Sequence, residues 1–462
     1  MALLLDGPPV ASLDDYRRIG GGRAVETVAR LGPAQVRKEI LLSGLRGRGG
    51  GGFRTGRKWA GVVDSAPAPR YAVCNGAEGE PGTFKDRVIL RHDPYAVLEG
   101  LVVAALAVEA EVAFFVTKAH YTEELGRVRD ALEELAGAGL TGGVDVRIVE
   151  GPDEYLFGEE KALLEVIEGR DPLPRLLPPF EHGLFARSIV TGWAGGGSPA
   201  VDPVVEHPSP TAVNNVETLA NVPFILERGA DWFRSIGTRD SPGTLVCTIV
   251  GDVRVPQVVE VDMGTPLQAV IDLAGGPLEG RTHLAALSGV ANPVIGPEHF
   301  ATPLDHESYR AAGLGLGSAG FVLYDDTACP VTIAAELSRF LYVESCGQCR
   351  SCKFGCGEIT RHLDRVNEGT ATENDIEVIG ARLRTVNEAV RCYLATEEQV
   401  LISSLLTRFP EEFALHLDGR CSVPEPREIL VPKIVDLRDG TVTYDERHRY
   451  KQPDWSYADP AG

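Results

Sequence analysis

The chain has 462 residues, which predicts about three domains at roughly 150 residues each. It is 44% hydrophobic and 24% charged, and its apolar run at residues 101–108 is far shorter than the roughly 20 residues of a membrane span. Lys and Arg number 45 against 66 for Asp and Glu, so the net charge is −21. An acidic surface repels nucleic acid and anionic lipid, so we expect no nucleic-acid partner and no direct membrane insertion.

Residues 1–240 alternate between helical and strand patterns, which predicts an α/β layered domain. Glycine-rich and polar loops are expected at 44–52 and 75–82, and the Gly-, Pro- and Ser-rich segment 192–210 is expected to be a surface loop. The expected helices cover 33–43, 88–107, 122–135 and 156–168, and the expected strands cover 71–74, 112–118 and 144–149.

The second half divides into three further segments. Residues 241–328 predict a small α+β domain, and residues 329–421 have a helical pattern throughout. Residues 422–462 predict a hairpin at 433–444, which turns at Asp439-Gly440, and a polar tail. Within the α+β segment the expected strands cover 245–250, 258–261 and 284–287, and the expected helix covers 266–274.

The cysteine content points to metal or redox chemistry. Residues 1–6 lack the basic segment of a secretory signal, so we expect a cytoplasmic location. In that compartment nine cysteines favour metal binding or redox work over a disulfide framework. Four of the nine are interpreted as small buried or surface thiols without a chemical role: Cys74, Cys247, Cys329 and Cys421.

Three cysteines at steps of three residues predict an iron–sulfur cluster. Cys346, Cys349 and Cys352 can surround one face of a [4Fe-4S] cube, with a remote thiolate as the fourth ligand. Zinc sites, the alternative, usually use separated cysteine pairs. Cys392, 40 residues after the triplet, is preferred as the fourth ligand over Cys356, because a fourth cysteine in an unbroken run usually serves a second cluster.

A glycine-rich basic loop at residues 44–59 predicts a phosphate-binding site. It holds seven glycines, five cations and no carboxylate, so backbone N–H groups can approach an anion while the cations balance its charge. Gly47-x-Gly49-x-x-Gly52 fits the dinucleotide fingerprint as a string, but it follows a helix rather than a strand. A second match to this fingerprint, at residues 315–320, precedes a strand rather than a helix and is therefore in the wrong context. The P-loop pattern also fails, because Arg57 and Lys58 stand where Lys and Ser or Thr are required.

Together with segments 75–87, 158–160 and 214–218 and the cysteines, this loop carries a family resemblance over residues 43–417. The chain resembles the family of NADH-oxidising, flavin-bearing (51 kDa-type) subunits of respiratory complex I, NAD-linked hydrogenases and formate dehydrogenases. The resemblance implies an α/β fold with a Rossmann-like FMN domain, a ubiquitin-like β-grasp (SLBB) domain and a C-terminal helical bundle that carries a [4Fe-4S] cluster.

The resemblance also implies the residues that contact the cofactors. The positions that match FMN contacts are Gly47, Gly49, Gly50, Lys58, Asn75, Glu78, Asn214, Asn215 and Thr218. The positions implied for NAD(H) and its surroundings are Phe53, Glu80, Glu159, Glu160 and Phe180, where the phenylalanines would stack on the adenine. The chain departs from the family pattern at Ala77, Gly61, Leu177 and Phe157, and by about twenty extra residues between 185 and 211.

These features predict an electron-input enzyme subunit with FMN, NAD(H) and a [4Fe-4S] cluster. A flavin is needed because nicotinamide donates a hydride, whereas the cluster accepts single electrons. We expect electrons to leave to a thioredoxin-like [2Fe-2S] subunit or a ferredoxin-type acceptor in a multi-subunit complex. The loop at 192–210 and the tail after Arg420 are candidate docking elements. Alternatives are reverse flow, NADPH or another donor, and a docking subunit without flavin.

Overall fold

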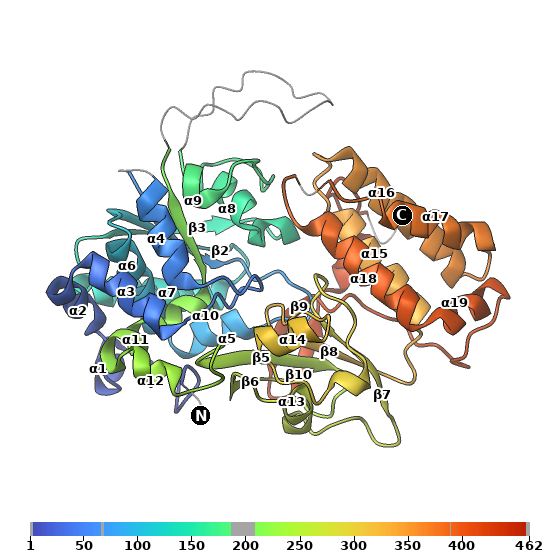
Figure 1. Ribbon diagram of the computed structural model, residues 1–462, viewed down its shortest axis with the longest axis horizontal. Helices are drawn as coiled ribbons and strands as arrows, with labels where there is room; N and C mark the ends of the chain where they lie inside the picture. Colours follow the sequence, from blue (N-terminus) through green and yellow to red (C-terminus); the bar gives the residue numbers. More distant parts are fainter. Residues whose placement is uncertain (1–2, 66–68, 186–207, 389, 459–462) are drawn as a thin grey trace.

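The computed structural model describes residues 3–65, 69–185, 208–388 and 390–458. Figure 1 shows an α/β part, which contains both the N-terminal helices and a parallel sheet, beside a second sheet and a group of long helices near the C-terminus. The predicted loop at 192–210 falls largely outside the described residues, which omit 186–207.

The first sheet is parallel and has the strand order β3-β2-β1-β4. Its strands are β1 (Tyr71–Gly76), β2 (Val112–Lys118), β3 (Asp145–Gly151) and β4 (Thr211–Asn215). The chain leaves β1 in one direction to build β2 and β3, and later returns to add β4 on the other side of β1. The order therefore reverses between β1 and β4, where an open α/β sheet forms a ligand crevice beyond the carboxyl ends of its strands.

Helices surround this sheet, and α6 is buried along almost its whole length. The predicted helix at 88–107 is two helices, because Pro94 starts a new helix and the Asp93 side chain caps it by accepting from the N–H of Ala96 at 3.0 Å. The helices of this part are α1 (Leu13–Arg18), α2 (Ala24–Leu31), α3 (Pro33–Ser43), α4 (Thr55–Ser65), α5 (Lys85–His92), α6 (Pro94–Ala107), α7 (Thr122–Gly137), α8 (Glu160–Ile167), α9 (Pro179–His182), α10 (Val216–Ala220), α11 (Val222–Arg228) and α12 (Ala230–Arg234), with the 3₁₀ turn η1 (Tyr155–Gly158).

The second sheet has the order β6-β5-β8-β7 and the β-grasp pattern. Its central strands are parallel to each other, while each outer strand is antiparallel to its neighbour. The strands are β5 (Thr244–Gly251), β6 (Gln257–Asp262), β7 (His283–Ser288) and β8 (Gly320–Asp325), accompanied by α13 (Leu267–Leu273), α14 (His306–Ala311) and η2 (Pro297–His299). The apolar side chains of α13 pack into one core with the inner faces of these strands.

The described residues of the predicted helical segment form five helices, and the predicted hairpin follows them (Figure 1). The helices are α15 (Pro330–Glu344), α16 (Arg350–Asn367), α17 (Glu373–Leu383), α18 (Leu394–Arg408) and α19 (Pro410–Leu417). The hairpin joins β9 (Ile434–Arg438) to β10 (Thr441–Tyr444), and η3 (Glu446–Tyr450) comes next. Asp439 and Gly440 both have positive φ, +48° and +75°, as a tight two-residue hairpin turn requires.

The described part of the C-terminal segment is bonded to the α/β part and to the helical region of the molecule. Pro432 accepts a hydrogen bond from the backbone N–H of Gly82 at 2.7 Å, which ties the segment to the α/β part. Lys451 places its ammonium 2.8 Å from the buried carboxylate of Glu344 at the end of α15. Residues 421–458 are thus held against the rest of the chain at these points, and the expectation that the tail after Arg420 takes part in docking stays a prediction.

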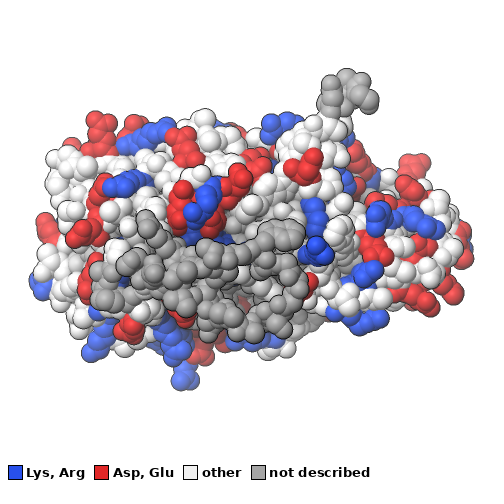
Figure 2. Space-filling view, turned by 90° about the horizontal axis from the view of Figure 1, so that it is seen from above, with Lys and Arg blue, Asp and Glu red and all other residues white. Residues whose placement is uncertain are grey.

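Acidic and basic side chains are interspersed over the described part of the face in Figure 2. Among the described helices, none combines the length and the apolar character that a bilayer crossing requires. The nine cysteines all lie among the described residues, and all are unpaired.

Candidate functional site

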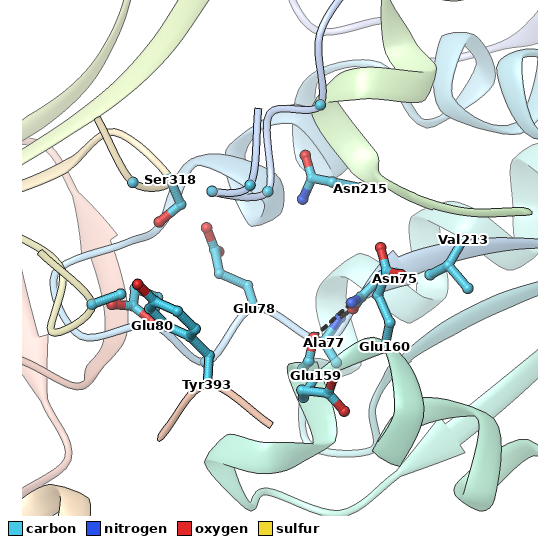
Figure 3. Close-up of a pocket in the computed structure, with 18 of the residues that line it drawn as sticks. Asn75, Ala77, Glu78, Glu80, Glu159, Glu160, Val213, Asn215, Ser318 and Tyr393 are labelled. Atoms are coloured by element: carbon cyan, nitrogen blue, oxygen red, sulfur yellow. Dashed lines mark hydrogen bonds between the residues drawn. The ribbon is translucent and has the colours of Figure 1, made fainter. Parts of the chain in front are cut away.

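A cavity of about 570 Å³ opens at the carboxyl ends of β1 and β4. It is lined from the α/β part, from the β-grasp sheet's loops and from the start of α18 (Figure 3). Thirteen of the fourteen predicted cofactor-binding residues line it: Gly47, Gly49, Gly50, Phe53, Lys58, Asn75, Glu78, Glu80, Glu159, Glu160, Asn214, Asn215 and Thr218. The structure therefore brings together residues that are up to 171 positions apart in the sequence.

Three asparagines mark the point where the sheet reverses its strand order. Asn75 at the end of β1 pairs in register with Asn215 at the end of β4, and Asn214 precedes it. The Asn75 amide donates to the backbone oxygen of Gly158 at 2.8 Å. Asn214 accepts from the indole N–H of Trp59 at 3.3 Å. These side chains are thus oriented by the polypeptide itself at the edge where parallel sheets bind ligands.

The glycine-rich loop is held over the cavity by a backbone contact. The N–H of Arg48 donates to the hydroxyl of Thr218 at 2.9 Å. At Gly50 φ is +115°, a conformation that residues with a Cβ rarely adopt. A Cβ at Gly49 would lie 3.1 Å from the Cβ of Asn215. The loop therefore needs glycine for its path, which leaves backbone N–H groups close to any bound anion.

Only one of the five cations of this described loop lines the cavity. Lys58 does so, and its ammonium donates to the backbone oxygen of Val213 at 2.8 Å and to the carboxylate of Glu160. Arg48 is buried and donates to the backbone oxygen of Pro242 at 2.9 Å. Arg54 and Arg57 line a different hollow. Of the five cations, Lys58 alone therefore reaches the cavity directly, and the joint charge balance expected from the sequence stays a prediction.

A buried charge network supports the floor of the cavity. The Lys85 ammonium lies 2.7 Å from Asp86 and 2.8 Å from Glu217, and 3.2 Å from the side-chain oxygen of Asn215. Although burial opposes its charge, these carboxylates raise the pKa of Lys85. The Asn215 amide in turn donates to Asp86 at 2.6 Å. Asn215 is thus fixed from both ends of its amide, independently of any ligand.

Two glutamates follow β1, of which Glu78 is buried and Glu80 is partly exposed. Glu78 accepts from the backbone N–H of Asp86 at 3.1 Å and lies 3.3 Å from the Arg87 guanidinium. Burial, and then the charge of Asp86, raise the pKa of Glu78. Glu80 accepts from the Tyr155 hydroxyl at 2.7 Å and from the N–H of Val290 at 2.6 Å. Burial raises the pKa of Glu80 as well, so both carboxyls hold a proton more readily than an exposed glutamate does.

The carboxylates of Glu159 and Glu160 have separate partners. Glu159 is the N-cap of α8, where it accepts from the N–H groups of Lys161 at 2.8 Å and Ala162 at 3.1 Å. Burial raises the pKa of Glu159 to about 7. Glu160 pairs instead with Lys58 across the cavity, and its side chain is 42% exposed. Of the two, Glu160 therefore presents the more accessible carboxylate to a ligand.

The two phenylalanines predicted to stack on a nucleotide differ in position. Phe53 lines the cavity and is 59% exposed, which leaves its ring available at the rim. Phe180 lies on α9, is 44% exposed and is not among the lining residues.

Ala77, where the family pattern has an acidic residue, lines the cavity and is buried. A Cβ added at Gly61 would meet nothing within 4 Å.

The cysteine triplet forms a second, smaller cavity together with Cys392. Cys346, Cys349, Cys352 and Cys392 all line it, whereas Cys356 is buried in α16 and does not. The triplet lies between α15 and the first turn of α16, and Cys392 lies just before α18. Cys392 also lines the large cavity, as do Leu156 and Leu394. The two cavities are therefore separated by a single layer of side chains.

Several lining residues were not predicted. Ala291, Asn292, Gly317 and Ser318 come from loops of the β-grasp part, while Tyr393, Leu394 and Glu397 come from the start of α18. Figure 3 shows Ser318 and Tyr393 facing the same space as Glu78. The glycine-rich sequence at 315–320 was a visible signal for this part of the cavity, although it is no dinucleotide fingerprint. Its Gly317 lies beside Gly50, since a Cβ placed on Gly50 would be 3.8 Å from the carbonyl carbon of Gly317.

Comparison with known proteins decides the family. The model of the Nuo51 FMN-binding domain matches residues 40–224, that of the SLBB domain matches 246–296, and that of the NADH-ubiquinone oxidoreductase-F iron-sulfur binding region matches 332–416. An NADH-quinone oxidoreductase F subunit of Rhizobium meliloti is 37% identical over 429 residues, 90% of this chain and 97% of that protein. The chain belongs to the family of NADH-quinone oxidoreductase F subunits.

Another F subunit and a solved structure agree with this assignment. The NADH-quinone oxidoreductase F subunit of Aquifex aeolicus is 35% identical over 90% of this chain and 94% of that protein. The crystal structure of an NAD+-reducing [NiFe]-hydrogenase in the H2-reduced state superposes with a TM-score of 0.76 at 30% identity, covering 91% of this chain and 66% of that chain. The predicted fold class, family resemblance and cofactor classes are thereby confirmed.

The residues present fit the cofactors of the F-subunit family. The large cavity offers a glycine cradle, the Lys58 ammonium and the buried hydroxyl of Ser318, which has no hydrogen-bond partner among the described residues. A flavin phosphate or ring can engage such groups. The small cavity offers four cysteine thiols, which is the ligand number of a [4Fe-4S] cluster. The chain is a flavin- and iron–sulfur-binding oxidoreductase subunit.

Proposed function

We propose that this subunit takes electrons from NADH in the large cavity and passes them singly to a partner redox protein. FMN supplies the necessary chemistry when bound, because it accepts a hydride and can release single electrons to an iron–sulfur cluster. The observation that carries the proposal is the shared wall: Cys392 and Leu394 line both the large cavity and the cysteine cavity. The chain itself would bind, orient and shield FMN and NADH in the large cavity and the iron–sulfur cluster in the cysteine cavity.

We assign the inner end of the large cavity to FMN. Backbone N–H groups at Gly49 and Gly50 and the ammonium of Lys58 would hold its phosphate, while Gly47, whose N–H donates to the backbone oxygen of Phe53 at 2.8 Å, would hold the loop in place beside it. Seven further flavin-facing groups are proposed from β1, β4, α10 and the β-grasp loop: Asn75, Glu78, Asn214, Asn215, Thr218, Asn292 and Ser318. The fixed hydrogen bonds of the first six favour this assignment, because an oriented site loses little entropy when it binds.

We assign the outer part of the cavity to NAD(H). Phe53 would stack on the adenine, and Glu80 and Glu160 would shape the pocket around the ribose units. Glu159 would act as a positioning residue, since its carboxylate caps the helix that presents Glu160. Phe180 would extend the stacking surface from α9, which contacts α4 behind the glycine-rich loop.

We propose that Cys346, Cys349, Cys352 and Cys392 ligate the [4Fe-4S] cluster, and that a thioredoxin-like [2Fe-2S] subunit or a ferredoxin-type protein docks beside it. The triplet is partly exposed, and exposed apolar residues lie near it: Phe354 is 72% exposed and Tyr393 is 55% exposed. Exposed aromatic residues beside a redox centre favour protein docking over solvent contact. The similarity to F subunits favours a place in a multi-subunit complex, and nine unpaired cysteines favour a reducing, cytoplasmic location.

Reverse flow is the second candidate, favoured by the similarity to an NAD+-reducing [NiFe]-hydrogenase. One experiment separates the directions and the nucleotides. The purified holoprotein is given NADH or NADPH with an artificial one-electron acceptor, and then NAD+ with an artificial low-potential donor. Faster acceptor reduction with NADH supports the proposal, faster NAD+ reduction supports reverse flow, and equal inactivity with all nucleotides contradicts both.

A further inference from the structure

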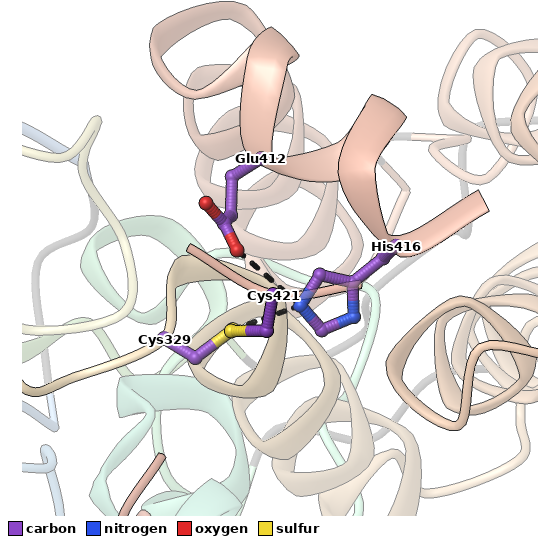
Figure 4. Close-up of side chains that lie close together, drawn as sticks. All are labelled: Cys329, Glu412, His416 and Cys421. Atoms are coloured by element: carbon purple, nitrogen blue, oxygen red, sulfur yellow. Dashed lines mark hydrogen bonds and ion pairs between the residues drawn. The ribbon is translucent and has the colours of Figure 1, made fainter. Parts of the chain in front are cut away.

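Two of the cysteines that have no part in the cluster cavity come together in a polar group at the far end of the helical region. Cys329, Glu412, His416 and Cys421 each place one ligand atom so that all four atoms lie within 4.8 Å of one another (Figure 4). Cys329 immediately precedes α15, Glu412 and His416 lie one turn apart on α19, and Cys421 follows that helix. Three chain segments therefore converge on one point.

The spacing within the group matches a tetrahedral metal site. Nε2 of His416 lies 3.3 Å from Sγ of Cys329 and 3.4 Å from Oε1 of Glu412. Ligands at about 2.3 Å for sulfur and about 2.0–2.2 Å for nitrogen and oxygen are separated by distances of this size when they surround one zinc ion. Hence a metal could enter between these atoms with little movement of the side chains.

The imidazole of His416 is already oriented for coordination. Its other ring nitrogen, Nδ1, lies 3.2 Å from the backbone oxygen of Val366. A histidine that ligates metal commonly donates its second ring N–H to a carbonyl, which leaves Nε2 free as the ligand atom. The carboxylate of Glu412 is held similarly, by the backbone N–H of Ser422 at 3.0 Å.

The charge of the group also calls for a cation. Cys329, Glu412 and His416 are buried, and His416 is the only ion-pair partner of Glu412 among the described residues. Two potential thiolates and a carboxylate in a buried place need a positive counter-charge. Cys421 is partly exposed, which gives a metal a route to the group.

We propose that Cys329, Glu412, His416 and Cys421 form a structural zinc site, separate from the iron–sulfur cluster. Two sulfur ligands, one imidazole and one carboxylate in tetrahedral positions suit Zn²⁺, and four protein ligands leave no open position for catalysis. Zinc there would fasten the start of α15 to α19 and to the segment that leads into the C-terminal hairpin.

The first test is metal analysis of the untagged holoprotein, purified without added metal or chelator. The proposal predicts about one zinc per chain in addition to the cluster iron. Zinc K-edge X-ray absorption is expected to show two sulfur neighbours at about 2.3 Å and two nitrogen or oxygen neighbours at about 2.0–2.2 Å. A shell of four sulfurs would mean zinc in the cluster cavity and would overturn the proposal, as would zinc far below one per chain.

Variants separate the two metal sites. Cys421→Ser and Cys329→Ser are expected to weaken zinc retention by more than about 100-fold, since loss of an outer hydrogen-bond partner alone costs about 10–100-fold. Iron content should stay unchanged in Cys421→Ser. Cys349→Ser should lose iron and keep zinc, and Cys247→Ala, a buried thiol elsewhere, should keep both. Unchanged zinc in Cys421→Ser, or a Cys329–Cys421 disulfide in the anaerobically purified wild-type chain, would contradict the site.

Discussion

The hydroxyl of Tyr155 donates to Oε2 of Glu80 at 2.7 Å, and the same hydroxyl lies 3.2 Å from both carboxylate oxygens of Glu397. One hydroxyl proton therefore faces two carboxyls, the partly exposed one of Glu80 in the loop after β1 and the buried one of Glu397 on α18. Burial, and then the charge of Glu80, raise the pKa of Glu397 well above its ordinary value. Because the folded protein raises the pKa of both Glu80 and Glu397, binding of a proton by this pair stabilises the folded state relative to the unfolded state.

This pair makes stability depend on pH. Because the folded pKa values are raised, the stabilisation is complete below the ordinary glutamate pKa of about 4.3 and is lost as the pH rises through the folded values. Glu397→Gln removes one titrating group without removing the polar side chain. We expect its melting temperature to fall less than that of the wild type between pH 5 and 8. Each unit of pKa shift that the substitution removes corresponds to about 1.4 kcal/mol of unfolding free energy.

The matched control for this prediction is Glu377→Gln, which changes an exposed glutamate on α17. Its melting curve should follow that of the wild type at every pH, measured at one scan rate. Parallel curves for wild type and Glu397→Gln would show that the Glu80–Glu397 pair does not share a proton.

Lys58 should determine flavin affinity. Lys58→Met removes the ammonium that lines the cavity but keeps an apolar stem on α4. Loss of a charge-assisted hydrogen bond costs about 1.5–3 kcal/mol, so the dissociation constant of FMN should rise by about 10–100-fold, measured by fluorescence titration of the apoprotein. Arg57→Met, on the neighbouring position but lining another hollow, should bind FMN as the wild type does. Equal weakening in both variants would refute the assignment of Lys58.

Cys392, rather than Cys356, should complete the iron–sulfur cluster. Cys392 shares the small cavity with the triplet, whereas Cys356 lies inside α16. We expect Cys392→Ser to lose most cluster iron and the electron paramagnetic resonance signal of the reduced cluster. Cys356→Ser should retain both. The reverse pattern would make Cys356 the ligand.

Gly61 should limit nucleotide affinity. It lies three residues after Lys58 on α4, so a side chain there would lie on the same helix face, where an added Cβ meets nothing within 4 Å. Gly61→Phe should add a stacking surface worth about 0.5–1.5 kcal/mol and lower the KM for NADH by about 2–10-fold. Gly126→Phe, a similarly open position on α7, should leave KM unchanged. An unchanged KM in Gly61→Phe would place the nucleotide elsewhere.

Local patterns predicted most elements, because strands such as β2 are continuous apolar runs with clear ends. Pro94 was visible in the sequence, but residues on both sides of it are helical, so one continuous helix was predicted where there are two. The site was predictable only where one continuous motif carries it, as in the glycine-rich loop. Glu397 could not be found in this way, since packing of α18 alone brings it to the loop after β1.

The cations of the glycine-rich loop illustrate a second limit. Composition counts Arg48 as part of a phosphate site, whereas the structure uses its guanidinium to bind Pro242 and to approach Glu217 at 3.8 Å. A charge count cannot distinguish a ligand-facing cation from one that holds the fold together.

Anaerobic titration of the holoprotein with NADH, followed by flavin absorbance and by electron paramagnetic resonance, decides whether this chain is an electron-input subunit. We expect the oxidised flavin band to bleach as NADH is added and a reduced cluster signal to grow, which Cys392→Ser abolishes while bleaching remains. A flavin band that stays unchanged under excess NADH would contradict the proposed function.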